Sequence, residues 1–353
     1  MSAPSKGVED TSAKVRVVAA MDKFRGTASA RALSDIVARS ANRQGCESDV
    51  QPMSDGGEGF REVFDGATSA VSVPGPLGEV VQAQVTLRRT PSGLVGVIEV
   101  AEAVGRDYLT SPSGDDALAA SSAGVGHLIL AASQLGAQSI LVGCGGSATS
   151  DGGLGCYQVL RDAGGLPVPV IAATDVRSSF LGARRFAVQK GVRSDDLGVI
   201  ERRLRDARAL YIAEQGVDVE LLDRSGAAGG IAGALAALGS LLTSGFDAVA
   251  HAVDLEDRIH RSTLVVTGEG RFDLGSLEGK VITGIAGLVD DSRRLLVVCG
   301  EVVPEALEAF ARNFPQAKVV SLVERFGAEA AMNETLNCVD EVVTTQVPDY
   351  LRT

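Results

Sequence analysis

Four segments of the chain place glycines next to carboxylates, and two of these segments add a cation. They cover residues 21–27, 53–59, 143–153 and 267–273. Glycines allow backbone N–H groups to approach an anion, while carboxylates hold Mg²⁺ or accept the proton of a substrate hydroxyl. Phosphoryl transfer requires all of these groups together. The four segments therefore indicate a phosphoryl-transfer site.

Each of these loops also has a simpler interpretation. Asp-Gly-Gly at 55–57 and Gly-Gly-Ser at 145–147 are common sequences in ordinary turns. For any one loop alone, the turn is the better explanation. Four such loops, each at a predicted strand end, favour a shared site, because ligands of open α/β sheets bind where the carboxyl ends of strands converge.

The third loop raises a competing hypothesis, a dinucleotide-dependent oxidoreductase. Residues 143–148 read Gly-Cys-Gly-Gly-Ser-Ala and match the G-x-G-x-x-A fingerprint of dinucleotide-binding enzymes. That fingerprint also requires an acidic residue about 20 residues further on, at the end of the next strand. Asp162 and Asp175 bracket this distance, but Asp162 falls in a helical pattern. A P-loop is absent, because residues 275–281 lack its spacing and its final Ser or Thr.

The composition narrows the class of protein. The 353 residues carry 33 Lys and Arg against 45 Asp and Glu, a formal charge of −12, which opposes nucleic-acid binding. Five cysteines without a CxxC spacing favour a reducing compartment over disulfides or a zinc site. Residues 1–14 contain no apolar leader, so we expect a cytoplasmic protein. The uncharged stretch 225–246 is mostly Gly, Ala, Ser and Thr, which predicts a buried helix rather than a membrane span.

Short runs rich in Val, Ile and Leu predict the strands that position these loops. The runs are 15–20, 48–53, 139–143, 263–267, 295–299, 318–323 and 341–345. Without polar alternation, such runs are typical of strands covered on both faces, as in a parallel sheet. Helical patterns follow at 29–42 and 281–289. Between 71 and 100 the residues alternate between apolar and polar, which predicts antiparallel hairpins.

These elements predict an α/β fold with two domains, as expected for a chain longer than one core can efficiently support. A doubly wound parallel-sheet domain is expected at 14–62 and 258–353. A second, mixed α/β domain is expected to interrupt it at 63–257, and a disordered tail is expected at 1–13. The sequence gives no indication of an oligomeric state.

The same loops resemble those of the type-1 glycerate kinases. The resemblance rests on residues 22–27, 52–59, 142–153, 226–230 and 267–273, which occur in the family's order. It implies a Rossmann-like domain interrupted by a second α/β domain, with the site in the cleft between them. It also implies Mg²⁺-dependent transfer of the ATP γ-phosphate to D-glycerate, with 2-phosphoglycerate as the favoured product.

The resemblance and the chemistry of glycerate together suggest roles for particular residues. Among the expected catalytic residues, Asp175 aligns the attacking hydroxyl, Arg271 binds the carboxylate or the γ-phosphate, and Lys190 neutralises phosphate charge. The expected substrate-binding residues are Asp22, Arg25, Ser54, Asp55, Gly56, Gly57 and Asp273, of which Asp55 and Asp273 are also expected to bind Mg²⁺. The expected ATP-binding residues are Gly145, Gly146, Ser147, Ala148, Thr149, Asp151, Gly152, Gly229, Gly230, Gly268, Glu269 and Gly270. The two domains are expected to close around the substrates.

The chain departs from the family pattern in three places. The family's Asp-Ser-Phe-Lys is Asp-Lys-Phe-Arg at 22–25, and a Gln-Thr after Asp273 is replaced by Gly-Ser at 275–276. Residues 174–180 read Thr-Asp-Val-Arg-Ser-Ser-Phe, where the family resembles Cys-Asp-Val-x-Asn-Pro-Leu. This last change leaves open a relative that binds a sugar acid or a nucleotide without turnover. The charged residues retained in the glycine-rich loops favour an enzyme.

Overall fold

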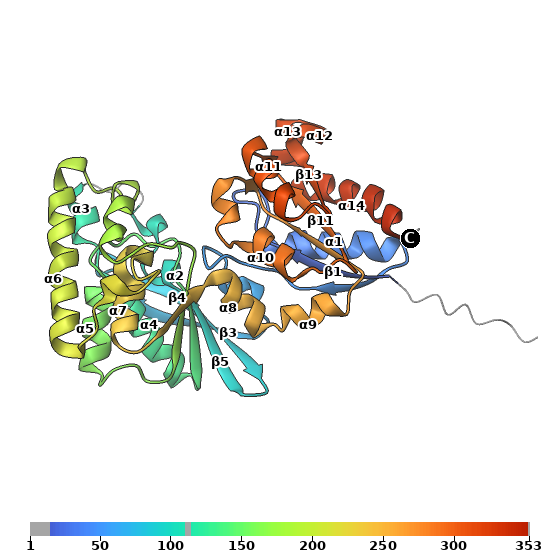
Figure 1. Cartoon of the computed structure of the whole chain (residues 1–353). Coiled ribbons are helices and arrows are strands. Elements are labelled where there is room, and N and C mark those ends of the chain that lie inside the picture. Colours follow the sequence, from blue (N-terminus) through green and yellow to red (C-terminus); the bar gives the residue numbers. More distant parts are fainter. Residues whose placement is uncertain (1–14, 110–113, 352–353) are drawn as a thin grey trace, which may run out of the picture.

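The computed structural model describes residues 15–109 and 114–351 (Figure 1). The tail expected at 1–13 lies outside these residues. Two large β-sheets, each flanked by helices, lie next to each other in the molecule (Figure 1). The strands of one sheet come from the two ends of the chain, and the strands of the other come from its middle.

The first large sheet is parallel and doubly wound. Its strands are β1 (Arg16–Met21), β2 (Glu47–Val50), β9 (Leu264–Gly268), β11 (Arg294–Cys299) and β13 (Ala317–Ser321). Their order in space is β13-β11-β9-β1-β2, so the strand order reverses between β1 and β9. Each of these strands overlaps a predicted run, and the predicted doubly wound parallel sheet is confirmed. Sheets of this kind bind ligands beyond the carboxyl ends of the strands at the reversal.

Alternate residues of β1 belong to two separate cores, which explains its continuous apolar sequence. Val17 and Ala19 pack with helices α1 (Ala30–Arg43) and α14 (Thr335–Leu351). Val18 and Ala20 belong to the core on the other face. The helices of that core are α8 (Gly245–Ala252), α9 (Leu255–His260), α10 (Val281–Leu288) and α11 (Pro304–Asn313).

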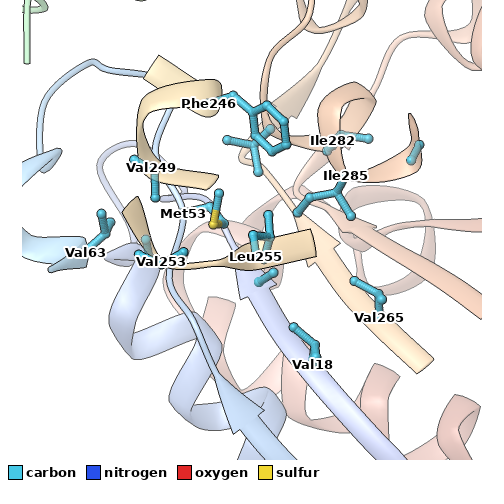
Figure 2. Packing of buried hydrophobic residues seen from close by; sticks show 14 of the residues in the cluster. Val18, Met53, Val63, Phe246, Val249, Val253, Leu255, Val265, Ile282 and Ile285 are labelled. Atoms are coloured by element: carbon cyan, nitrogen blue, oxygen red, sulfur yellow. The ribbon is translucent and has the colours of Figure 1, made fainter. Parts of the chain in front are cut away.

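The core around Val18 joins helices from the middle of the chain to the first sheet. Figure 2 shows Phe246 of α8 next to Ile282 of α10, with Leu255 of α9 above the first sheet. The fit is tight, because a Cβ on Gly284 would lie 2.3 Å from the Phe246 ring. Met53, which follows β2, is fully buried in the same cluster (Figure 2).

The second large sheet is mixed. In spatial order its strands are β3 (Ala67–Pro74), β4 (Val80–Thr90), β5 (Gly93–Glu99), β6 (Ser139–Gly143), β7 (Val170–Thr174) and β8 (Leu241–Ser244). The first three pair antiparallel, as the alternation between 71 and 100 predicts, and β5 to β8 pair parallel. Its accompanying helices are α2 (Val100–Val104), α3 (Gly114–Ala119), α4 (Ala123–Gln134), α5 (Leu154–Asp162), α6 (Leu197–Gln215) and α7 (Ile231–Ala237).

Two predicted elements are wrong. Residues 341–345 lie within helix α14 rather than in a strand. Val339, Val342 and Val343 recur at helical spacing and are buried against α1, and five β-branched or polar residues are too few to reveal that period. The single buried helix expected at 225–246 is instead α7, strand β8 and the start of α8, although every residue of α7 is buried.

The chain crosses between the two sheets twice, after β2 and before β9. The first predicted domain boundary, at 62–63, falls after β2, in the short helix η1 (Arg61–Val63). The second, at 257–258, falls within α9, which packs on the first sheet. Both boundaries stay predictions. Within residues 15–109 and 114–351, no helix combines the length and the apolar character that a membrane crossing requires.

Candidate active site

The carboxyl ends of both large sheets open into a cavity of about 790 Å³. On the side of the first sheet, the cavity is lined by the loops after β1, β2 and β9. The strand pair β10 (Arg271–Phe272) and β12 (Glu301–Val302) and helices α12 (Leu322–Phe326) and α13 (Ala328–Asn333) complete this side. On the side of the second sheet, the loops after β6 and β7 line it. Met21 pairs with Gly268 where the strand order reverses, so Asp22 and Glu269 begin two adjacent loops of the cavity.

Most of the predicted site residues meet at this cavity. Those that line it are Asp22, Arg25, Asp55, Gly57, Gly145, Gly146, Ser147, Asp175, Lys190, Gly229, Glu269, Gly270 and Arg271. Those that do not line it are Ser54, Gly56, Ala148, Thr149, Asp151, Gly152, Gly230, Gly268 and Asp273. Some of the second group hold the loops in shape. The carboxylate of Asp151, for example, accepts hydrogen bonds from the N–H groups of Ser122 and Gly153 at 2.9 and 3.0 Å.

Glycines allow the loops of the two sheets to touch through their backbones. A Cβ on Gly145, after β6, would lie 2.4 Å from Cα of Gly57, and one on Gly245, after β8, would lie 2.0 Å from the carbonyl oxygen of Asp55. Gly56 has a φ of +94°, a conformation that side chains disfavour. The loop after β2 is therefore held against the carboxyl ends of β6 and β8, and this contact places Asp55 in the cavity.

Four of the carboxylates that line the cavity act on one another through their charges, and they form a carboxylate cluster of Asp22, Asp55, Asp175 and Glu269. Burial is the largest cause that raises the pKa of Asp22 well above its ordinary value, and the charge of Asp55 is the next. The same two causes raise the pKa of Asp175 to about 6. For Glu269 burial is again the largest cause, and the pKa reaches about 7. Because burial and mutual repulsion both disfavour the ionised forms, this carboxylate cluster attracts cations.

Two lysines provide positive charge beside the carboxylate cluster. Nζ of Lys280, the residue before α10, lies 3.5 Å from Oδ2 of Asp55. Burial lowers the pKa of Lys280, but the nearby carboxylates, Asp55 most strongly, outweigh this and raise the pKa above its ordinary value. Nζ of Lys23 donates a hydrogen bond to the carbonyl oxygen of Glu58, and its charge opposes the rise in the pKa of Asp22.

Lys190 lies in the opposite wall of the cavity, at the end of the short helix η4 (Val188–Lys190). Only 8% of its surface is exposed. Its Nζ donates hydrogen bonds to Oγ of Ser147 at 2.8 Å and to the carbonyl oxygen of Thr149 at 2.7 Å. Burial lowers the pKa of Lys190 to about 8. The loop after β6 thus positions a buried ammonium group against the cavity.

The two predicted arginines lie at the exposed edge of the cavity. The side chain of Arg25 is 70% exposed and lies 3.9 Å from the carboxylate of Glu58. Arg271 lies 2.8 Å from Glu301 and 3.8 Å from Asp273. The carboxylate of Asp273 also accepts a hydrogen bond from the N–H of Gly275 at 2.9 Å and caps the short helix η8 (Leu274–Leu277). Asp273 therefore does not line the cavity, and its carboxylate serves as the cap of η8.

Comparison with known families identifies the family of the chain. The model of the glycerate kinase family matches residues 17–163 and 166–348. The chain belongs to the glycerate kinase family. It is therefore a kinase that acts on an alcohol group, and the family implies ATP as the phosphoryl donor. The oxidoreductase hypothesis does not fit, because the glycines at 143–148 open no helix and α5 begins only at Leu154.

Several proteins that are similar to this chain are named as glycerate kinases. Glycerate 2-kinase of Escherichia coli (strain K12) is 35% identical over 275 residues, which are 67% of this chain and 71% of the relative. Glycerate kinase of Bacillus subtilis (strain 168) is 30% identical over 312 residues, 77% of this chain and 81% of the relative. A crystal structure named provisionally as glycerate kinase 2, from Salmonella typhimurium LT2, aligns with a TM-score of 0.78 and 25% identity. The alignment covers 96% of this chain and 98% of that chain.

Three cations of the cavity lie outside the predicted set: Lys23, Lys280 and Arg106. Lys23 stands between Asp22 and Arg25, which are both predicted site residues, so its position in the sequence could have indicated a role in the site. Lys280 ends a glycine-containing segment whose spacing differs from a P-loop. Arg106 follows helix α2 in a segment without the glycine-rich pattern, and nothing in the sequence points to it.

Proposed function

We propose that this glycerate kinase family member transfers the γ-phosphate of ATP to D-glycerate and produces 2-phosphoglycerate and ADP. The observation that carries this proposal is the cavity itself. It combines buried carboxylates, lysines and glycine-rich backbone at the carboxyl ends of two sheets. Phosphoryl transfer depends mainly on positioning and charge stabilisation, so this set is sufficient without a covalent nucleophile.

Asp175 is the residue that we propose accepts the proton of the attacking hydroxyl group of glycerate. It follows β7, lines the cavity, and is mostly buried next to the charge of Asp55. A pKa of about 6 keeps Asp175 largely ionised at neutral pH while leaving it basic enough to accept a proton. The carboxylate therefore orients the hydroxyl and takes its proton as the phosphoryl group arrives.

The donor set of the cavity fits Mg²⁺. Asp55 and Glu269 offer hard carboxylate oxygens, and Oε1 of Glu269 is buried without a hydrogen-bond partner among the described residues. In that part of the chain, no three acidic, His or Cys side chains form a preformed metal site. This agrees with Mg²⁺, which proteins usually hold through one or two carboxylates together with substrate phosphates. When bound, the ion neutralises charge on the phosphates.

We propose Asp55 and Glu269 as the residues that hold Mg²⁺. Asp55 is one of the two ligands expected from the sequence, and Glu269 takes the place of the other, Asp273, because Asp273 caps η8 outside the cavity lining. Lys280 lies 3.5 Å from Asp55, and the charge of Lys23 acts on Asp22 and Asp175. These two lysines are the proposed cations for the ATP phosphates.

The proposal is tested by incubating the purified protein with ATP, Mg²⁺ and one acid at a time. D-glycerate, L-glycerate, tartronate and erythronate form the panel, and phosphorus NMR identifies the product. We expect ADP and a phosphate ester on the secondary carbon of D-glycerate. An ester on the primary carbon would contradict the assigned product. ADP release with none of the acids would favour the alternative, a relative that binds a sugar acid or a nucleotide without turnover.

A further inference from the structure

Lys190 is a buried cation in the wall of the cavity. Both acceptors of its ammonium group, Oγ of Ser147 and the carbonyl oxygen of Thr149, are neutral. Among residues 15–109 and 114–351, no carboxylate lies within ion-pair distance of Lys190. Burying a charge without a direct ion-pair partner is costly, and burial lowers the pKa of Lys190 although the more distant charges of Asp151 and Asp175 oppose this shift. An anion that binds at this wall removes the cost.

Arg106 adds a second cation to the same wall. Its N–H donates a hydrogen bond to the carbonyl oxygen of Gly146 at 3.1 Å, and the preceding Gly105 forms a β-bridge with Ser147. Arg106 also lines the cavity, and its charge acts on Lys190. No ion pair of Arg106 is present in the described part of the chain. Two cations from other segments, Lys190 and Arg106, therefore hydrogen-bond to the loop after β6, and neither has an ion-pair partner among the described residues.

Three of the other four cations of the cavity are paired with carboxylates, and the fourth, Lys23, donates a hydrogen bond to the carbonyl oxygen of Glu58. Arg25, Arg271 and Lys280 each lie within 4.0 Å of a carboxylate oxygen, at 3.9, 2.8 and 3.5 Å. Lys280 and Lys23 lie beside the carboxylate cluster on the side of the first sheet, where we place Mg²⁺ and the phosphates. The unpaired charges of Lys190 and Arg106 are thus on the side of the second sheet.

The position of Asp175 favours a carboxylate over a phosphate at this wall. Asp175 follows β7 of the second sheet, and its charge acts on Lys190. One small molecule can therefore place a hydroxyl at Asp175 and an anion at Lys190. The backbone closes this end tightly, because a Cβ on Gly229 would lie 3.0 Å from Nζ of Lys190 and 2.0 Å from the carbonyl oxygen of Thr149. Such a closed end suits a short acid.

We propose that Lys190 and Arg106 bind the carboxylate of a short hydroxy acid, and that the pair selects an acid over an uncharged alcohol. This inference rests on the proposed function and assigns Lys190 to the acid substrate in place of the phosphate role expected from the sequence. Two charge-assisted hydrogen bonds to one carboxylate also fix the orientation of the acid relative to Asp175.

The experiment compares Lys190→Met and Arg106→Met with the wild type. D-glycerate binding and ATP binding are measured separately by calorimetry, and turnover is measured with D-glycerate and with glycerol, which lacks the carboxylate. Lys190→Met should weaken D-glycerate binding by about tenfold to a hundredfold while ATP binding changes less than about threefold. The preference for D-glycerate over glycerol should fall by the same factor. Lys318→Met, which removes an exposed lysine 3.8 Å from Asp349, is the matched control and should change none of these values.

An equal loss of ATP and D-glycerate binding, or an unchanged preference over glycerol, would overturn the assignment. If Lys190→Met does not fold by circular dichroism, the exposed Arg106→Met decides with the same readouts. The proposed kinase function fails separately, if the wild type binds D-glycerate but releases no ADP. In that case, D-glycerate binding that depends on Lys190 would still support the carboxylate site.

Discussion

At the scale of single residues, Asp55 dominates the electrostatics of the cavity. Its charge adds to burial in raising the pKa of Asp22, Asp175 and Glu269, and its carboxylate pairs with Lys280 at 3.5 Å. A cation near Asp55 therefore changes the proton affinity of the other carboxylates. This coupling makes the pH dependence of the reaction a test of the roles that we propose.

The rate constant kcat/KM should rise with pH and level off above the pKa of Asp175, which is about 6, because only the ionised carboxylate accepts the hydroxyl proton. The charge of Lys280 opposes the upward shift that burial and Asp55 impose on Asp175. Lys280→Met should therefore raise this pKa and move the acidic limb of the profile to higher pH. A profile that is flat across the acidic range, or a limb that Lys280→Met leaves in place, would refute the role of Asp175. Lys318→Met again serves as the control.

Residue types alone could identify part of the site. Asp22, Asp55 and Glu269 stand in glycine-rich loops after predicted strands, and all three line the cavity. Asp175 also lines it, but no predicted strand precedes this residue, which is expected from the family resemblance instead. The sequence could not separate these from Asp273, which occupies a loop of the same design. Its carboxylate caps η8, and only tertiary structure distinguishes a cap from a ligand.

At the scale of elements, the contact between two loops sets the geometry of the cavity. Gly57 follows β2 of the first sheet, and Gly145 follows β6 of the second. The Cβ position of Gly145 lies only 2.4 Å from Cα of Gly57, so the backbones touch where a side chain would separate them. This contact also explains in part the high glycine content of the chain, 42 residues.

Gly145→Ala should push these loops apart and lower kcat/KM by about a hundredfold, because small displacements of positioned groups are costly to catalysis. Circular dichroism should show that the variant remains folded. Gly287→Ala in α10 is the control, since a Cβ there meets nothing within 4 Å, and it should stabilise the helix by up to about 1 kcal/mol. If Gly145→Ala retains wild-type kcat/KM, the loop contact does not set the site.

Elements with a long or two-sided apolar signal could be predicted, and short ones could not. Strands such as β9 and β11 are buried on both faces and read as continuous apolar runs. Residues 341–345 looked similar, but their valines belong to the buried face of α14. Strand β8 has four residues within a stretch of small residues, so its sequence carries no comparable signal.

At the scale of the whole molecule, the cavity depends on two sheets that the chain connects twice. The Asp22 and Glu269 loops come from the first sheet, while the Asp175 and Lys190 loops belong with the second. The distance between Asp175, the proposed proton acceptor, and the ATP phosphates therefore depends on the relative position of the two sheets. If the two predicted domains close around the substrates, the closed cavity excludes water from ATP.

We expect the two halves to approach each other when both substrates bind. Small-angle scattering should show a smaller radius of gyration with D-glycerate and a non-hydrolysable ATP analogue in the presence of Mg²⁺ than without ligands. Each ligand alone is the control, and should give a smaller change or none. A radius that is the same in all four conditions would contradict closure.

The central claim is that phosphoryl transfer takes place in the cavity between the two sheets, and the turnover of Asp175→Asn tests it most directly. The substitution keeps the size of the side chain but removes the carboxylate that accepts the hydroxyl proton. With thermal unfolding as the check on folding, we predict a fall in kcat of about 10²- to 10⁴-fold with ATP and D-glycerate. A folded variant with kcat within about threefold of the wild type would contradict the account, because loss of a positioned proton acceptor is expected to cost far more.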